Sequence, residues 1–240
     1  MQILLVAAAA MFASVVGGIA GYGTGLLLPL VLVPIVGPEP VVPIMAIAAF
    51  FINASRVAAF RAAIDWRRTV LVLATAVPAC VLGAWFYTWL SATGTQLVIG
   101  AFLILSVPLR RILKSRELRL NDTGLAIGGA GFGAVTGTAP GTGVILISML
   151  MASGLTGAAV IATDAAISVI AHFVQALVFG VAGVIDLRVV TVALLIGVCS
   201  VPGAFLARRI VERLPVRLHA AVLDVIVLIG GAAMVANALS

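Results

Sequence analysis

Two Gly-Thr-Gly triplets, at 23–25 and 141–143, interrupt apolar stretches of the chain. Glycine costs about 1 kcal/mol relative to alanine inside a helix, so each triplet predicts a helix break. A helix that starts at such a break points unpaired backbone N–H groups and the positive end of its dipole at the break. Glycine lets a ligand approach the backbone, and threonine can donate a hydrogen bond. The triplets therefore indicate a binding site for a small anion.

An alternative reading is that the glycines only let helices pack closely, which is what we expect of the glycine pairs 17–18 and 128–129. For the two triplets we favour the ligand reading, because they are paired and each precedes a short apolar segment. The substrate-binding candidates at the breaks are Gly23, Thr24, Gly25, Thr138, Pro140, Gly141, Thr142 and Gly143, and Thr136 is a further hydroxyl donor.

Polar side chains inside apolar segments are the second group of candidates, because such residues are costly in a membrane and mark functional sites. Arg56 can neutralise an anion, but so near the segment end it can also reach the water interface, and both readings stay open. Four polar residues at spacings of 4, 4 and 3 share one helical face, which should point to a cavity or another helix. The residues on this face are Asp164, Ser168, His172 and Gln175. Together with Asn53 and Arg56 they make up the second group of candidates.

Asn53, Arg56, Ser168, His172 and Gln175 are expected to contact the substrate, and His172 and Asp164 are the candidates for proton coupling. Histidine titrates in the physiological range, so His172 can carry a coupling proton. The alternative for His172 is a hydrogen bond between helices.

The elements that hold these residues are predicted to be membrane helices. Of the 240 residues, 63% are hydrophobic and 9% charged, whereas a soluble domain carries about 25% charged residues. The composition therefore predicts an all-α polytopic membrane protein. Apolar runs give ten segments: 3–20, 25–36, 40–60, 69–90, 95–109, 123–139, 142–153, 157–182, 189–207 and 217–238.

The two segments that follow the breaks, 25–36 and 142–153, hold only a dozen residues each. A dozen helical residues rise about 18 Å, which is short of the roughly 30 Å hydrocarbon core of a bilayer. We therefore expect half-helices. Whether they cross fully or return to the same side stays open.

Basic residues predict the orientation in the membrane. They concentrate in the stretches 61–68, 109–122 and 208–217, while the connections 37–40 and 91–95 contain no lysine or arginine. The positive-inside rule places the first group in the cytoplasm and the second outside. The net charge of +6 is thus explained by topology, and we expect no nucleic-acid partner.

The two halves of the chain resemble each other. Residues 23–25 align with 141–143, and Ile-Asp-x-Arg at 64–67 aligns with 185–188. We predict one integral membrane domain made of a first repeat (1–113), a basic cytoplasmic linker (114–121) and a second repeat (122–240). Five segments per repeat is an odd number, so the second repeat should be inverted, as in many secondary transporters. Both termini then lie outside, on the periplasmic side, and the first segment is expected to be retained.

Motifs of soluble enzymes are absent from the sequence. It contains no Walker A loop, no HExxH, no GxSxG and no cluster of metal ligands. We therefore expect no enzyme activity, no cofactor and no metal, and any transport to be gradient-driven or passive. Cys80 and Cys199 form no CxxC motif, and an intramembrane thiol oxidoreductase would need their Cβ atoms about 3.5–4.5 Å apart.

The chain resembles the sulfite exporter TauE/SafE family of bacterial membrane permeases. The resemblance rests on GGIAGYGTGLLLPLVL at 17–32 and AIDWR at 63–67, and on the second copies GTGVILISML at 141–150 and FGVAGVIDLR at 179–188. It covers nearly the whole chain in both repeats. It implies an inner-membrane permease that exports, or sometimes imports, sulfite, sulfonates or related sulfur or carboxylate anions.

The leading hypothesis is therefore a multi-pass secondary transporter of the cell inner membrane, with alternating access around the paired breaks. Its expected partners are a small anionic substrate and the lipid bilayer, while proton coupling and a homodimer stay open. The alternatives are an anion channel on the same scaffold and, less favoured, the thiol oxidoreductase.

Overall fold

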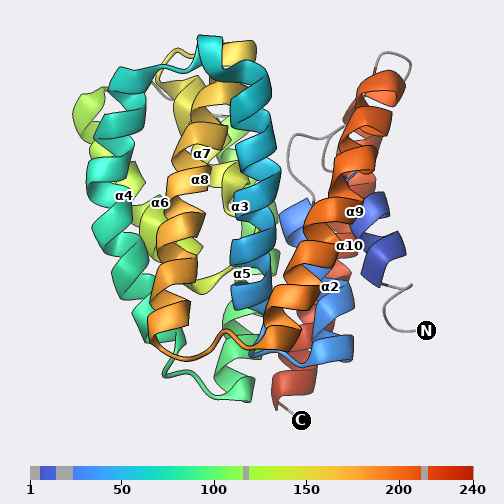
Figure 1. The fold of residues 1–240 in the computed structure, drawn as a ribbon. Coiled ribbons are helices and arrows are strands. Elements are labelled where there is room, and N and C mark those ends of the chain that lie inside the picture. Colours follow the sequence, from blue (N-terminus) through green and yellow to red (C-terminus); the bar gives the residue numbers. More distant parts are fainter. Residues whose placement is uncertain (1–5, 15–23, 116–118, 212–215, 240) are drawn as a thin grey trace.

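The computed structural model describes residues 6–14, 24–115, 119–211 and 216–239, and every regular element in these residues is a helix (Figure 1). Each of the ten predicted segments corresponds to one helix, so the predicted all-α fold is confirmed. After the helical residues 6–14 come α2 (Thr24–Val36), α3 (Val41–Phe60), the 3-10 turn η1 (Arg61–Ala63), α4 (Trp66–Tyr87), α5 (Ala92–Ser115), α6 (Asp122–Thr138), α7 (Gly143–Ala152), α8 (Ala158–Val181), α9 (Leu187–Val211) and α10 (Val216–Leu239).

Four helices in the described part of the chain are long and apolar enough to cross a membrane. They are Val41–Ala58 within α3, α4, Ala92–Leu109 within α5, and α8. Large apolar side chains on their outer sides stay uncovered, as at Leu82 and Val181, and a lipid environment suits such surfaces. The chain is therefore a multi-pass membrane protein.

Some helix ends differ from the predicted ones for local reasons. α4 begins at Trp66, three residues earlier than predicted, because the Asp65 side chain accepts a hydrogen bond from the Arg68 backbone N–H (2.9 Å) and caps the helix. α5 continues to Ser115, beyond the predicted end at 109, so the helix enters the stretch predicted as a linker.

Hydrogen bonds between connections define two faces of the molecule. Arg68 Nη2 donates to Ser153 O (2.8 Å) and Leu120 N donates to Ala152 O (2.9 Å), so the starts of α4 and α6 lie beside the end of α7. We call this the basic face, because residues 61–68 and the described parts of the basic stretch 109–122, up to 115 and from 119, lie at it. At the opposite face, Tyr87 Oη donates to Glu39 O (2.9 Å), which places the 37–40 connection beside the end of α4.

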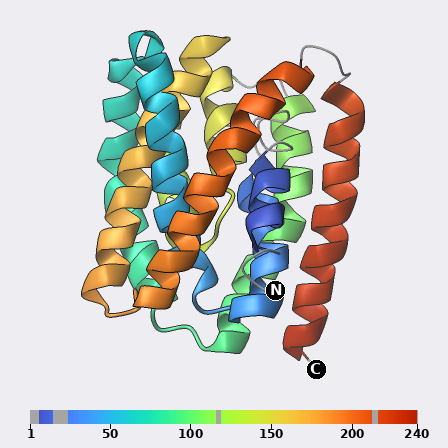
Figure 2. The same cartoon turned by 45° about the vertical axis from the view of Figure 1, so that its right-hand side comes forward.

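The two short helices run from the middle of the molecule to opposite faces. α2 ends at the turn beside Tyr87, while α7 ends beside the start of α4 (Figures 1 and 2). The 13 residues of α2 and the 10 residues of α7 rise about 20 Å and about 15 Å, which together match the hydrocarbon core. The starts of α2 and α7 therefore lie between the two faces of the molecule, and α6 with α7 forms a hairpin that returns to the basic face.

Small residues bring α4 and α6 into close contact. A Cβ atom added to Gly133 would collide with Ala76 O, and one added to Gly129 would lie 2.6 Å from Thr75 Oγ1. Such close approach is typical of membrane helix pairs. The packing role expected of Gly129 is thus confirmed. Gly128 also packs closely, but against the Met149 side chain of α7, while residues 17–18 lie outside the described residues.

Corresponding elements of the two halves make corresponding contacts. α3 packs against α9 as α8 packs against α4, and α2 contacts α10 as α7 contacts α5. The aligned aspartates also have the same local role, because Asp186 Oδ1 accepts from Val189 N (2.7 Å) at the start of α9 as Asp65 does at the start of α4.

Candidate functional site

The two predicted breaks meet in the middle of the molecule. A Cβ atom added to Gly25 would lie 2.5 Å from the Cα of Gly141, and one added to Gly141 would lie 2.9 Å from Gly25 O. Gly141 also has φ of +88°, a conformation that favours glycine. Backbone from the two halves of the chain is therefore in direct contact at residues of the two aligned triplets.

Two helices begin at this junction. α2 starts at Thr24 and α7 at Gly143, so both present the N–H groups of a first helical turn and a positive dipole end. Thr24 Oγ1 donates to Ala13 O (3.2 Å), while Thr142 Oγ1 lies 2.8 Å from Thr136 Oγ1. The Thr24 hydroxyl therefore ties the start of α2 to residue 13, and the Thr142 hydroxyl closes the break between α6 and α7.

A cavity of about 90 Å³ lies beside the junction, between α3 and α8. It is lined by the breaks, by the polar face of α8, and by one face of α3. The lining residues are Thr24, Gly25, Val42, Met45, Ala46, Ala49, Ile52, Asn53, Arg56, Pro140, Gly141, Thr142, Gly143, Asp164, Ser168, His172 and Gln175.

The four polar residues of α8 that share a helical face all line this cavity. Gln175 is buried and its Nε2 donates to Thr136 O (2.6 Å), which leaves its Oε1 3.1 Å from His172 Nδ1. Because Gln175 Oε1 can only accept, His172 Nδ1 is the donor, and in the neutral ring Nε2 is then an acceptor. This hydrogen-bond chain fixes the imidazole relative to the break after α6.

The cavity contains one cationic and one carboxyl side chain among the described residues. Arg56 is half-buried and its Nη1 lies 3.5 Å from Asn53 Oδ1, while Asn53 Nδ2 donates to Ala49 O (2.9 Å). Asp164 is 3% exposed, and its Oδ1 has no hydrogen-bond partner among the described residues. Arg56 is near enough to Asp164 for the two charges to attract each other.

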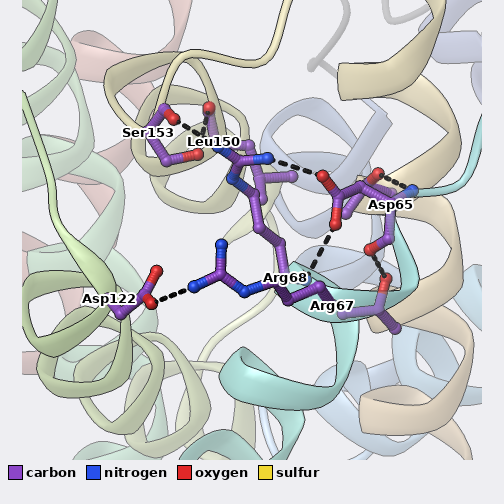
Figure 3. A network of polar contacts seen from close by, with 8 residues as sticks. Asp65, Arg67, Arg68, Asp122, Leu150 and Ser153 are labelled. Carbon is purple, nitrogen blue, oxygen red and sulfur yellow. Dashed lines mark hydrogen bonds and ion pairs between the residues drawn. The ribbon is translucent and has the colours of Figure 1, made fainter.

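A second polar network lies on the basic face, outside the cavity (Figure 3). Arg68 pairs with Asp65 and donates to Ser153 O, and Arg67 pairs with Asp122. The hydrogen bond from the Arg68 backbone N–H holds the pKa of Asp65 below its ordinary value, and the Arg68 guanidinium adds to this effect against the opposing effect of burial. Asp65 N also donates to Thr163 Oγ1 (3.0 Å), so the network contacts α8 next to Asp164.

Most described residues predicted for the site line the cavity, and Thr138 and the further donor Thr136 do not. Thr138 Oγ1 donates back to Val135 O (3.1 Å) within its own helix and does not line the cavity. Gly23 lies outside the described residues. Cys80 and Cys199 are free thiols, and Cys80 Sγ contacts Ala171 O (3.6 Å).

The apolar lining from α3 escaped the sequence reasoning. Its members are Val42, Met45, Ala46, Ala49 and Ile52. They recur every three or four residues on the face that also carries Asn53 and Arg56, and this periodicity is the signal that could have identified them.

A helical membrane protein whose broken helices meet at a buried polar cavity belongs, by its geometry, with membrane transport proteins. The family model described as "Sulfite exporter TauE/SafE" matches residues 6–234. The chain therefore belongs to the TauE/SafE family, a family of membrane transporters named for sulfite export. No match was found among curated proteins or among solved structures.

Proposed function

We propose that this protein is a secondary transporter that carries a small anion across the bacterial inner membrane by alternating access. The substrate is sulfite, a sulfonate or a related sulfur or carboxylate oxyanion. The observation that carries this proposal is the convergence of two helix N-termini and Arg56 on one cavity at the junction of Gly25 and Gly141.

The charges around the cavity favour an anion. The first turns of α2 and α7 supply N–H groups and positive dipole ends, and the Arg56 guanidinium supplies a full charge that can hold an oxyanion through two hydrogen bonds. Thr24, Thr142 and Ser168 add hydroxyl groups at the cavity wall. The cavity volume of about 90 Å³ suits an anion of a few non-hydrogen atoms.

The mechanism follows from treating the halves as inverted repeats, with the cavity on the axis between them. The equivalent short helices α2 and α7 run to opposite faces. In the aligned halves α3 corresponds to α8 and α9 corresponds to α4, so the contact of α3 with α9 is the counterpart of the contact of α8 with α4. These correspondences support a pseudo-two-fold relation. Exchange between two equivalent arrangements would open the cavity first to one face and then to the other.

The orientation in the membrane is part of the same proposal. The basic face carries residues 61–68 and the described residues of the basic stretch 109–122, so the positive-inside rule puts it in the cytoplasm. Both termini are then periplasmic.

Counterflow in proteoliposomes tests the proposal. Proteoliposomes loaded with unlabelled sulfite should accumulate labelled sulfite transiently, and the initial rate of this uptake should saturate with the external sulfite concentration. Arg56→Gln should reduce that rate at least roughly tenfold, because it removes the only full positive charge among the described lining residues. Arg61→Gln is the matched control, since Arg61 is exposed in η1 and outside the cavity. Flux without saturation or counterflow, with high unitary conductance, would instead favour the channel.

A further inference from the structure

A carboxyl group in the wall of an anion site presents a conflict of charge. Asp164 lines the cavity, is 3% exposed, and has an Oδ1 atom without a hydrogen-bond partner among the described residues. Buried polar groups are normally hydrogen-bonded, so an unpartnered carboxyl oxygen facing a cavity indicates a group that changes partner in function. An ionised Asp164 would repel the anion that the rest of the site attracts.

The titratable and charged groups around Asp164 are few. Among the described lining residues they are Arg56 from α3 and His172 from α8 itself, eight residues along. Of the other elements packed on α8, α4 contributes Cys80, whose thiol contacts Ala171 O, and the Asp65–Arg68 pair at its start. η1 contributes the exposed Arg61, while Thr136 and Thr142 bring hydroxyl groups from the break between α6 and α7. Arg56 is thus the full positive charge that shares the cavity with Asp164.

We propose that Asp164 binds a proton together with the anion, so that proton and anion are carried as one load. This inference rests on the proposed function. In the empty site the charges of Arg56 and ionised Asp164 cancel. A monoanion entering that site would leave a net negative charge in an apolar environment, which is strongly unfavourable. Protonation of the Asp164 carboxylate restores neutrality and leaves Arg56 to pair with the anion.

The balance of the step is simple. The carboxylate of Asp164 gains one proton from water as the anion binds, and it returns that proton to water when the anion leaves. Because the coupling is thermodynamic, protonation of Asp164 strengthens anion binding by the same factor by which the anion favours protonation. A monoanion then moves without net charge, and its flux follows the sum of the anion gradient and the pH gradient.

Titration calorimetry of the purified protein in buffers of different ionisation enthalpy tests this inference. Methanesulfonate and ethanesulfonate are suitable probes, since both are monoanions that stay fully ionised between pH 5 and about pH 9 and cannot themselves supply or take up protons. At a pH where Asp164 is ionised in the free protein, we expect close to one proton taken up per anion bound. Affinity should fall up to about tenfold per pH unit there.

Asp164→Asn should bind the probes with affinity independent of pH and without proton uptake. Asp164→Glu, which keeps a carboxyl group, should retain uptake and shows that the site tolerates substitution. His172→Gln should also retain uptake.

The outcomes separate the two proposals. Wild-type binding without proton uptake overturns the proton site and leaves the anion site standing. Uptake that survives in Asp164→Asn and vanishes in His172→Gln overturns the assignment to Asp164. If neither probe binds at any pH, the anion site itself falls, and the proton proposal falls with it.

Discussion

Gly141 combines two constraints at one residue. Its φ of +88° is unfavourable for side chains other than glycine, and its Cα is in close contact with Gly25. Gly143, two residues away in the same cavity wall, has no atom within 4 Å of an added Cβ. The two glycines of one triplet therefore differ in role: the first makes the junction between the halves, and the second leaves open space at the start of α7.

Gly141→Ala should destabilise the protein, because the added methyl group meets the Gly25 backbone and the left-handed conformation costs of the order of 1–3 kcal/mol. A lower melting temperature in detergent, measured by a thiol-independent dye or by light scattering, would reveal this. Gly143→Ala is the matched control and should melt close to the wild-type temperature. Equal melting temperatures for both variants would contradict the contact between the breaks.

At the scale of elements, each short helix is held at its far end by an arginine from the other half of the chain. Arg68 donates to Ser153 O at the end of α7 (2.8 Å), and Arg188 donates to Ile35 O in the last turn of α2 (3.4 Å). Each arginine closely follows the aspartate that caps α4 or α9. A cation at a helix C-terminus is also favourable for the helix dipole. Arginines at or next to the repeated Ile-Asp-x-Arg sequence thus anchor the half-helices to the two faces. Arg188 is the arginine of the second copy, whereas Arg68 follows the first copy, whose own Arg67 pairs with Asp122.

The Asp65 network predicts a dependence of stability on pH. The pKa of the Asp65 carboxyl is lowered in the folded protein from its ordinary value of 3.8, so Asp65 binds a proton more readily in the unfolded state. The stabilising contribution is therefore fully present above pH 3.8 and is lost as the pH falls through the lower folded pKa. We expect the melting temperature of Asp65→Asn to be below wild type near neutral pH and to converge with it in acid. Asparagine is still a good N-cap, so the variant isolates the charge; a gap that widens in acid would contradict the network.

At the scale of the whole molecule, the sequence predicts the helices well because apolar length and glycine breaks are local signals. The shift of α4 to Trp66 depends on the cap by Asp65, which apolar runs do not register. The polar face of α8 was predictable from its spacing. The contact of Gly25 with Gly141 depends on packing between distant segments, and no local pattern encodes it. The hydrogen bond of Thr138 to Val135 O is local, and it shows that this hydroxyl is satisfied by its own helix.

Alternating access of this cavity is the central claim, and side-specific labelling of one cavity residue tests it most directly. Ser168→Cys, in a chain carrying Cys80→Ala and Cys199→Ala, places one thiol in the cavity wall. A membrane-impermeant maleimide would be added to vesicles of defined orientation from one face at a time, with and without methanesulfonate. We predict labelling from both faces and slower labelling when the anion is bound. Labelling from one face only, or rates that the anion leaves unchanged, would contradict the account.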